Sequence, residues 1–367
     1  MTRSCHLAYY SFFAWLIGIS LARAGEQGAD SARPVISTEL FPILSYDTDT
    51  GVGYGVKVFA VNQVGLDESF DLILFNSTKG ERWYRLVFSL PDFERRQGTV
   101  YPLAIDLTVD YDKWISNSFF GVGNGSTYDN QETYTREPLE ISLILNHAFS
   151  PSIVCQGGLK YEAIRNFNFS ERSRLIDLQP ALNRSRVSFA SLYAGLRYDT
   201  RNTYVNPSHG IVVLSECAIA PHTQLNDVGF TRIAGWLQSY SPLFSDRFVL
   251  ANRLGIQGLV GQNLPVQVLL PIGGNNTLRG SPQDRFLDKV TAVANIEIRF
   301  PVCWRFGGVV AFDAGKVWNK FSEIDLARWT TSPVAGLRFY MDTFVVRADV
   351  GFGRETTGFY LNFGHVF

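Results

Sequence analysis

Apolar and polar residues alternate one by one along several stretches of this chain. In the segment TFVVRADVGFG (343–353) the even-numbered positions are apolar, whereas Arg347 and Asp349 occupy odd positions. The segment VTAVANIEIRFPV (290–302) repeats this pattern, with Glu297 among its polar positions. Successive side chains of a β-strand point to opposite faces of a sheet, so a period of two indicates a strand. Both segments therefore predict strands with one apolar and one polar face.

Similar stretches recur along the chain after residue 34. They predict about sixteen strands, near residues 35–46, 52–62, 69–79, 81–91, 99–112, 134–149, 151–166, 185–199, 209–220, 228–242, 246–260, 290–301, 308–317, 331–341, 343–352 and 357–367. A transmembrane β-barrel has such strands, because its outer face meets lipid and its inner face lines a polar lumen. A soluble sandwich is the alternative, because there the apolar faces of two sheets pack together.

The predicted connections alternate in length. The long connections span residues 113–133, 167–184, 261–289 and 318–330. They all fall at one end of a barrel if consecutive strands run in opposite directions. The other end has tight turns, as at Ser150-Pro151-Ser152 and Met341-Asp342. Long loops at one end and short turns at the other are typical of outer-membrane barrels.

The end of the chain, FYLNFGHVF, favours the barrel. One face of the last predicted strand carries Phe359, Leu361, Phe363 and Phe367. A strand that finishes on a terminal aromatic residue is hard to explain in a soluble sandwich, so we treat these residues as a barrel signal. We therefore predict an all-β fold, a transmembrane antiparallel β-barrel of outer-membrane type over residues 35–367.

The N-terminus has the layout of a secretory signal peptide over residues 1–24. A basic Arg3 precedes an apolar run (7–21), and Ala22-Arg23-Ala24 follows as a cleavage pattern. The run is shorter than the about 20 apolar residues that a spanning helix needs. We expect export to the bacterial outer membrane and a short periplasmic segment over residues 25–34.

Composition excludes several classes of function. A formal net charge of −1 gives no basic surface for nucleic acid. Cys155, Cys217 and Cys303 are odd in number and show no CxxC spacing, so neither a disulfide framework nor a metal site is expected. By strand parity Cys155 and Cys217 both face lipid, about 10 Å apart, which is too far for a disulfide.

Catalysis finds little support. The histidines after the N-terminal region are scattered, at His147, His209, His222 and His365. None has metal-ligand spacing, and no G-x-S-x-G elbow occurs. A Ser–His pair assembled across strands stays open as an alternative. We expect no enzyme, no cofactor and no metal.

Four stretches in order along the chain resemble motifs of the Omp85 superfamily, the barrels of BamA, TamA and the two-partner secretion transporters, also called bacterial surface antigen D15 proteins. They are RYDTRNTYVNPSHG (197–210), LRGSPQDRF (278–286), NIEIRFP (295–301) and VAFDAGKVW (310–318). The resemblance covers residues 35–367.

The chain departs from the family pattern in two respects. Family members usually carry POTRA domains, which need roughly 50 residues or more, whereas about ten residues precede the first strand after cleavage. The sequence therefore resembles a barrel-only branch. In the loop motif, Leu278 stands where Val or Ile is usual, and Ser281 stands where an aromatic packing group is usual.

The resemblance implies that the loop motif of Leu278, Arg279 and Gly280 folds into the barrel. Arg279 then meets the lumen residues Glu297 and Asp313, whose parity places both on the polar face. A turn near 304–305 puts these two carboxylates almost opposite each other, where a guanidinium can bridge them. The alternative is a porin whose lumen simply carries these acids and a set of arginines, Arg299, Arg305, Arg338 and Arg347.

The stretch after residue 198 predicts a periplasmic turn. Its motif residues are Asp199, Arg201, Asn202, Pro207 and Gly210. Polar side chains, a proline and a glycine are typical of a turn that holds itself. We favour this structural interpretation over a docking surface.

The resemblance implies insertion or translocation of proteins, or lipid handling, through a lateral seam between the first and last strands. Unpaired strand edges are templates for a further strand. Expected partners are outer-membrane lipid and client outer-membrane proteins, with a separate periplasmic partner or a second copy replacing the POTRA domains. A passive channel plugged by the loop and a purely structural barrel are the alternatives.

Overall fold

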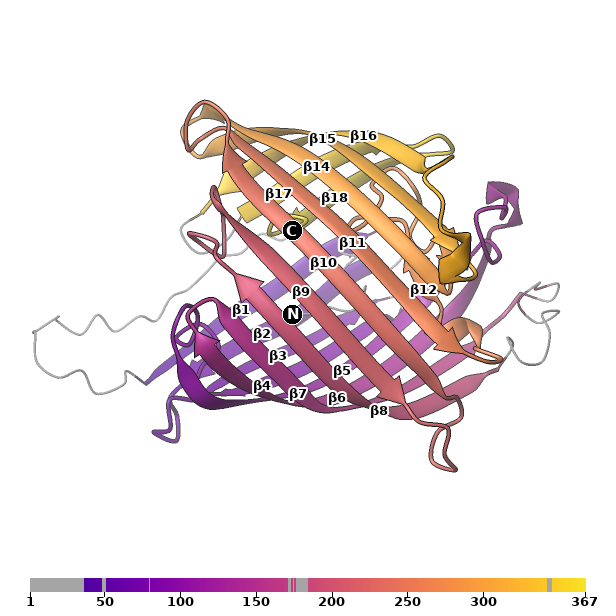
Figure 1. The fold of residues 1–367 in the computed structure, drawn as a ribbon, viewed down its shortest axis with the longest axis horizontal. Helices are drawn as coiled ribbons and strands as arrows, with labels where there is room; N and C mark the ends of the chain where they lie inside the picture. Colours follow the sequence, from indigo (N-terminus) through magenta and orange to yellow (C-terminus); the bar gives the residue numbers. More distant parts are fainter. Residues whose placement is uncertain are drawn as a thin grey trace, which may run out of the picture.

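The computed structural model describes residues 36–47, 51–78, 80–170, 173, 175, 184–341 and 345–367. The predicted signal peptide (1–24) and N-terminal segment (25–34) lie outside them. Within the described residues, sixteen strands form one antiparallel sheet that curls into a barrel (Figure 1). No helix in this part of the chain is long and apolar enough to cross a membrane. The predicted all-β, sixteen-stranded antiparallel fold is confirmed.

Each strand of the barrel pairs with its neighbours along the chain. The strands are β1 (Ser37–Asp47), β2 (Gly51–Val61), β3 (Ser69–Ser77), β4 (Arg82–Leu90), β5 (Tyr101–Phe119), β6 (Glu132–Ser150), β7 (Ile153–Phe167), β8 (Arg186–Asp199), β9 (Gly210–Ala220), β10 (Phe230–Pro242), β11 (Val249–Gly261), β14 (Val290–Cys303), β15 (Phe306–Trp318), β16 (Thr330–Tyr340), β17 (Val345–Phe352) and β18 (Thr357–Phe363).

The connections contain the remaining described elements. A two-stranded sheet of β12 (Leu270–Ile272) and β13 (Phe286–Asp288) lies between β11 and β14. Short 3-10 turns are η1 (Tyr128–Asn130), η2 (Val266–Val268) and η3 (Phe321–Glu323).

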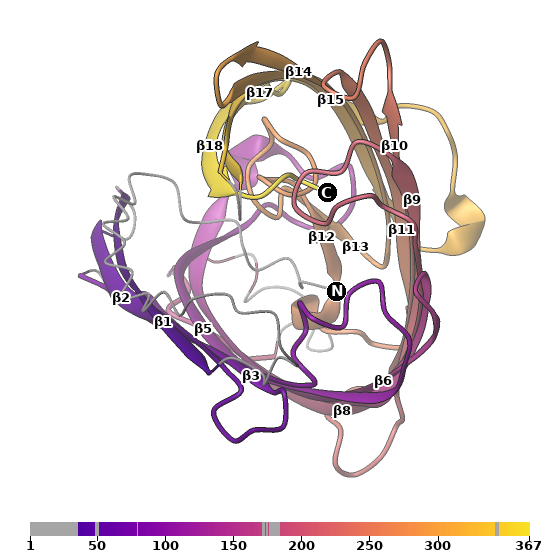
Figure 2. The same ribbon diagram turned by 90° about the vertical axis from the view of Figure 1, so that its left-hand side faces the viewer.

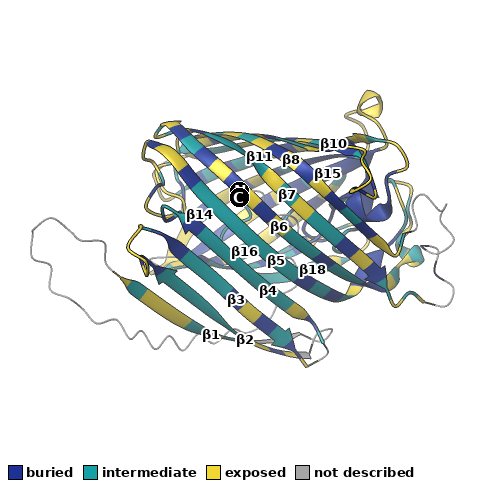
Figure 3. Cartoon of the chain, turned by 90° about the horizontal axis from the view of Figure 1, so that it is seen from below, coloured by how far each residue is buried: buried dark blue, intermediate teal, exposed yellow. Residues whose placement is uncertain are grey.

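Burial alternates along the strands. On β14, Asn295 and Glu297 are fully buried, whereas Ile296 keeps 48% of its surface exposed. Figure 3 shows the alternation as buried and exposed bands along several strands. Charged and polar side chains thus line the interior and apolar side chains cover the outer wall, as the period of two predicts.

β5 and β6 extend further than predicted, so the expected long loop over 113–133 is wrong in its bounds. The two strands leave only residues 120–131 between them. Their register shifts between Trp114 and Asn117. An irregularity of this kind breaks the alternation from which strand ends are read.

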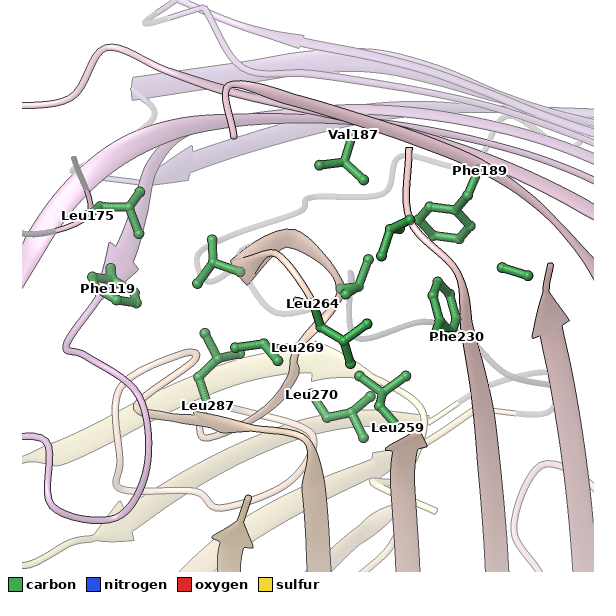
Figure 4. Close-up of a cluster of buried hydrophobic side chains, with 14 of the residues drawn as sticks. Phe119, Leu175, Val187, Phe189, Phe230, Leu259, Leu264, Leu269, Leu270 and Leu287 are labelled. Atoms are coloured by element: carbon green, nitrogen blue, oxygen red, sulfur yellow. The ribbon is translucent and has the colours of Figure 1, made fainter. Parts of the chain in front are cut away.

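The connection 262–289, named here the inward loop, folds back into the barrel. Its Leu264 and Leu269 belong to an apolar cluster with Phe189 and Phe230 of the wall (Figure 4). The cluster lies inside the barrel at the end where the long connections lie, called the long-loop end below. The opposite end is called the short-turn end.

The sheet is open along one side. Within the described residues no ladder of backbone hydrogen bonds joins β1 to β18, and Figure 2 shows β1 and β2 diverging from β18. β1 pairs along its length with β2, and β18 pairs with β17. Pro42 in β1 lacks a backbone donor, which suits an edge strand. The barrel therefore has a seam between β1 and β18.

The predicted strand 357–367 ends early, at Phe363. Gly364 then takes a φ of 78°, a conformation that side chains disfavour, and the chain turns inward. Phe367 packs inside the barrel against Tyr240 and Val249. The expectation that Phe367 shares the outer face with the other barrel-signal residues is therefore wrong.

The other barrel-signal residues stay within β18. Phe359 keeps 49% of its surface exposed on the outer wall, and Leu361 is half-buried two positions further on. The side chain of Phe363 lies outside the described part of the structure.

Candidate functional site

Arg279 lies at the tip of the inward loop, fully buried among three carboxylates of the wall. Its Nε and Nη2 donate to the two carboxylate oxygens of Asp313 at 2.8 and 2.9 Å. Its Nη1 donates to Glu297 at 2.9 Å and to Asp349 at 2.8 Å. Burial disfavours the charge, but the hydrogen bond to Asp313 and the nearby carboxylates outweigh it and raise the pKa of Arg279 well above its usual value. The guanidinium is thus charged and held in one geometry.

Further arginines of the wall share two of these carboxylates. Glu297 and Asp349 are contacted by Arg299, Arg338 and Arg347. Asp313 differs, because within the described residues its one ion pair is with Arg279. Arg305 lies apart from these arginines in the sheet, in the turn between β14 and β15. Arg279 is therefore the specific counter-ion of Asp313 and one of several for the other two acids.

Glu297 and Asp313 are not opposite each other. Asp313 pairs with Asn295, and Glu297 pairs with Ala311, one position further on the same face. The register shifts between 301 and 303, beside the turn, and this irregularity makes the predicted pairing wrong. The resulting diagonal still places both carboxylates within reach of one guanidinium. Asp349, the third carboxylate, was visible in the sequence only as a polar-face position of its strand.

The loop tip touches β17 backbone to backbone. Gly280 has a φ of 93°, and a Cβ there would lie 2.5 Å from the backbone nitrogen of Gly353. A Cβ on Gly351 would lie equally close, 2.5 Å, to the carbonyl carbon of Arg279. Only glycine permits both the dihedral and this approach.

Tyr360 ties the loop tip to the last strand, β18. Its hydroxyl accepts a hydrogen bond from Gly280 N at 2.9 Å and donates to the Ser281 carbonyl at 3.2 Å. The hydroxyl of Thr356 donates to the Gly280 carbonyl at 2.8 Å. These contacts are not predicted from the sequence; the available signal is the place of Tyr360 on the inward face of its strand, beside the outward-facing Phe359.

The two departures from the family motif are accommodated differently. Leu278 is fully buried and packs with Ile272 and Phe286. Ser281 is also buried, and its carbonyl accepts the hydrogen bond from Tyr360. The hydrogen bond from Tyr360 to the backbone of Ser281 therefore fixes the position at which the family motif usually has an aromatic side chain.

Arg285, whose role is not predicted from the sequence, joins the inward loop to the β17–β18 hairpin. Its Nε and Nη2 donate to the two carboxylate oxygens of Glu355, in the β17–β18 hairpin, at 2.6 and 2.7 Å. The guanidinium lies over the rings of Phe120 and Phe286, 5.0 and 4.5 Å from their centroids. A bidentate pair combined with ring stacking is a geometry that arginine supplies and lysine does not.

The turn between β8 and β9 is held by its own side chains. Arg201 donates Nε and Nη2 to Asp199 at 3.0 and 2.7 Å. Asn202 Oδ1 accepts two backbone N–H groups at 3.0 and 3.2 Å. Pro207 is buried, and Gly210 has a φ of 111°. These contacts are those of a self-supporting turn.

The same turn meets the C-terminal tail (365–367). His365 Nε2 and Asn206 Oδ1 lie 3.0 Å apart. Arg299 Nη2 donates to the Phe367 backbone oxygen at 3.1 Å, and the guanidinium of Arg253 lies 5.1 Å from the Phe367 ring centroid. The tail thus connects the turn at the short-turn end with the arginines of the lumen.

A cavity of about 500 Å³ lies in the lumen between the inward loop and the wall. Its charged lining includes both signs, at Arg136, Lys160, Glu162, Glu216 and Arg232. Within the described residues, no group of three or more His, Cys, Asp and Glu side chains is placed to hold a metal ion. Free thiols in this part of the chain are Cys155, Cys217 and Cys303.

Comparison with known proteins identifies the family and the fold. The family model described as the Omp85 superfamily domain matches residues 62–367. The chain is similar to the crystal structure of BamA from Haemophilus ducreyi lacking POTRA domains 1–3, with 15% identity, a TM-score of 0.64, and coverage of 90% of this chain and 69% of that chain. It is also similar to CdiB from Acinetobacter baumannii, with 15% identity, a TM-score of 0.55, and coverage of 90% and 66%.

CdiB from Escherichia coli is a further similar structure, with 12% identity, a TM-score of 0.59, and coverage of 92% of this chain and 62% of that chain. The chain thus spans about two thirds of the length of these structures. No curated protein matches it. Because the family model covers most of the chain, and the solved barrels share its fold, this chain belongs to the Omp85 superfamily.

Proposed function

We propose that this protein assists the insertion or translocation of proteins, or the handling of lipid, through the seam between β1 and β18. The observation that carries the proposal is that these two strands are edges of one sheet with no ladder between them in the described residues. An unpaired edge offers a row of backbone donors and acceptors to a further strand. Barrels of this superfamily sit in the bacterial outer membrane, so the proposed partners are lipid and client strands.

The two edges are poorly matched to each other, which supports a seam that opens. β1 runs over Ser37–Asp47, whereas β18 is shorter, over Thr357–Phe363. Leu40 of β1 keeps 58% of its surface exposed, and Ile36, just before the strand, keeps 66%. Gly364 turns the chain inward just after β18 and removes residues that would otherwise extend the edge.

Contacts of the inward loop support a role for it in positioning β18. Tyr360 of β18 bonds Gly280 and Ser281, and Glu355 before β18 is clamped by Arg285. Arg279 anchors the same loop to β14, β15 and β17. A shift of the loop therefore acts directly on the last strand, and the loop is the proposed regulator of the seam.

A solute channel is the second candidate, because the lumen contains the cavity of about 500 Å³ with charged walls. The apolar cluster of the inward loop lies inside the barrel at the long-loop end, and several of its residues line this cavity. Displacement of the loop would therefore widen a path through the lumen. Single-channel recording tests this candidate: a steady conductance that Arg279→Ala increases favours a channel.

A disulfide across the seam tests the primary proposal. We would place cysteines at Leu40 of β1 and Phe359 of β18, on a background with serine at 155, 217 and 303. The matched control joins Val350 and Phe359, which already face each other on β17 and β18. The readouts are the level of folded outer-membrane proteins in cells and the insertion of a purified barrel protein into vesicles.

The proposal predicts that the seam pair crosslinks in part and that its crosslinked form loses insertion activity, while the control pair stays active. Reduction of the disulfide should restore activity. Equal activity of the locked seam and the locked control would rule out a lateral route.

A further inference from the structure

The connection between β15 and β16 (319–329), named here the outer flap, folds down over the outside of the barrel. Figure 2 shows it outside the wall that contains β9–β11. Trp318 and Trp329 meet edge to face at 5.9 Å and cluster with Val290 and Ala292 of β14. Val290 is fully buried although its parity places it on the outer wall. The flap is thus part of the outer surface of the barrel.

An ion pair secures the flap to the wall. Lys316 of β15 donates to both carboxylate oxygens of Asp325 at 2.7 and 2.8 Å and to the Ala327 carbonyl at 2.7 Å. Lys316 lies on the outer face by parity, where a lysine is unfavourable next to hydrocarbon. The flap covers it and supplies its counter-ion, so the two features depend on each other.

A groove of about 550 Å³ opens between the flap and the wall. Its floor is made of small side chains, and it is lined by Ala194, Ser215, Cys217, Gly235, Gly258 and Phe321. Phe321 rests on Gly258: a Cβ at that glycine would lie 1.9 Å from the Phe321 ring. Gly258 therefore provides the space that lets the ring form one wall of the groove.

The groove continues the apolar outer wall. Bordering side chains such as Leu196, Ile233 and Ile256 keep between 40% and 48% of their surface exposed. An unfilled apolar void loses the dispersion contacts of its lining, so the groove favours an apolar occupant. In a barrel that spans a membrane, the apolar matter that meets this surface is the acyl chain of a lipid.

Charge on the flap indicates the headgroup. Lys320 and Arg328 are exposed, as is Glu323, while Asp325 is paired with Lys316. The exposed part of the flap thus carries more positive than negative charge. Such an excess at the membrane surface attracts an anionic, phosphate-bearing headgroup.

We propose that this groove is a lipid-binding site, which holds one acyl chain of an anionic, phosphate-bearing lipid between Phe321 and the small residues of β8–β11, with Lys320 beside the headgroup. The site lies on a different part of the barrel from β1 and β18, so its test does not depend on whether the seam opens.

Native mass spectrometry of the purified full-length barrel, loaded with phosphatidylglycerol, tests the site by counting retained lipids. Gly235→Phe fills the groove, and a Cβ there meets only Ile256 at 3.8 Å, an ordinary contact. Leu143→Phe is the matched control, since Leu143 is exposed on the outer wall of β6 and does not line the groove. Heat-modifiable migration in electrophoresis confirms that each variant is folded.

The unaltered protein and Leu143→Phe should retain one lipid more than Gly235→Phe, and Phe321→Ala should reduce the retained fraction several-fold. Equal retention by the unaltered protein and Gly235→Phe would overturn the site. Zwitterionic phosphatidylcholine should be retained less than phosphatidylglycerol, and equal retention of the two would overturn the assigned headgroup.

Discussion

Arg279 contacts Asp313 through three hydrogen bonds, from its backbone N–H, its Nε and its Nη2, at 3.1, 2.8 and 2.9 Å. One carboxylate of β15 thereby anchors both the backbone and the side chain of the loop tip. Both side chains are fully buried. The pair therefore links the inward loop directly to the wall.

Arg279→Ala should destabilise the barrel by about 3–5 kcal/mol, because it leaves a buried carboxylate without its counter-ion. Asp313 is the acid that loses its ion pair, whereas Glu297 keeps Arg299. Adding Asp313→Asn to Arg279→Ala should recover part of the loss. Urea unfolding followed by heat-modifiable migration measures both effects.

Arg247→Ala is the control for this prediction. Arg247 is exposed in the turn between β10 and β11, and its loss should change stability by less than about 0.5 kcal/mol. If Asp313→Asn makes the Arg279→Ala protein still less stable, the unpaired carboxylate of Asp313 is not the cause of the destabilisation.

Gly280→Ala should displace the loop tip. The residue has a φ of 93°, and its Cβ would lie 2.5 Å from Gly353 N. Gly65→Ala isolates the dihedral strain, because Gly65 has a φ of 86° and nothing within 4 Å of its Cβ. Strain alone costs about 1–2 kcal/mol. Gly280→Ala should therefore lower the free energy of unfolding, measured in urea, by more than Gly65→Ala does. Equal costs would show that the close approach to Gly353 is unimportant.

Tyr360→Phe should loosen β18 without emptying space, since it removes only the hydroxyl that bonds Gly280 and Ser281. We expect a loss of about 1–3 kcal/mol, because the partly buried Gly280 N–H loses its acceptor. Hydrogen exchange of β18 should rise, and crosslinking across the seam should change. Tyr54→Phe, at a tyrosine that is 52% exposed, should leave both unchanged; the same response in both variants would contradict a specific role of Tyr360.

Phe367→Ala should release the C-terminal tail from the lumen. The half-buried ring packs with Tyr240 and lies under the guanidiniums of Arg253 and Arg299, contacts worth roughly 1–2 kcal/mol together. Carboxypeptidase should then shorten the tail several-fold faster. Phe359→Ala, on the outer wall, should leave the rate unchanged, and an unchanged rate in Phe367→Ala would mean that other contacts hold the tail.

Asp325→Asn should release the outer flap. The hydrogen bond from Lys316 and that from Ala327 N hold the pKa of Asp325 below its usual value. The ion pair therefore stabilises the flap at neutral pH, and this contribution is lost as the pH falls below about 4 and through the folded-state pKa. Asn mimics the protonated acid at neutral pH, where trypsin cleavage after Lys320 and Arg328 should accelerate.

The half-buried ion pair of Lys57 and Asp71, 3.1 Å apart, provides the control for the flap. Asp71→Asn should leave the cleavage of the flap unchanged. Equal protection of the flap in Asp325→Asn and the unaltered protein would show that the tryptophan contacts suffice to hold it.

Alternation along the chain was enough to predict the sixteen-stranded sheet and the polar interior, whereas the place of Arg279 near Glu297 and Asp313 followed from the resemblance of its loop motif to the Omp85 superfamily. Alternation with a period of two is a local property, because each residue's side of the sheet follows from its neighbour's. The loop motif then pointed to a cation where the polar faces of β14 and β15 carry acids. The same alternation placed Asp349 on the polar face of its strand.

The register and the path of the chain beyond the strands became visible in the folded structure and not before. The irregularity near residues 301–303 moved Glu297 one pair away from its predicted partner. Gly364 sent Phe367 into the lumen, where arginines from other strands receive it. The outer flap turned down onto the wall because Lys316 and Asp325 meet there. A bulge, a left-handed glycine and a long-range ion pair each depend on contacts between strands, and alternation along one strand contains no information about them.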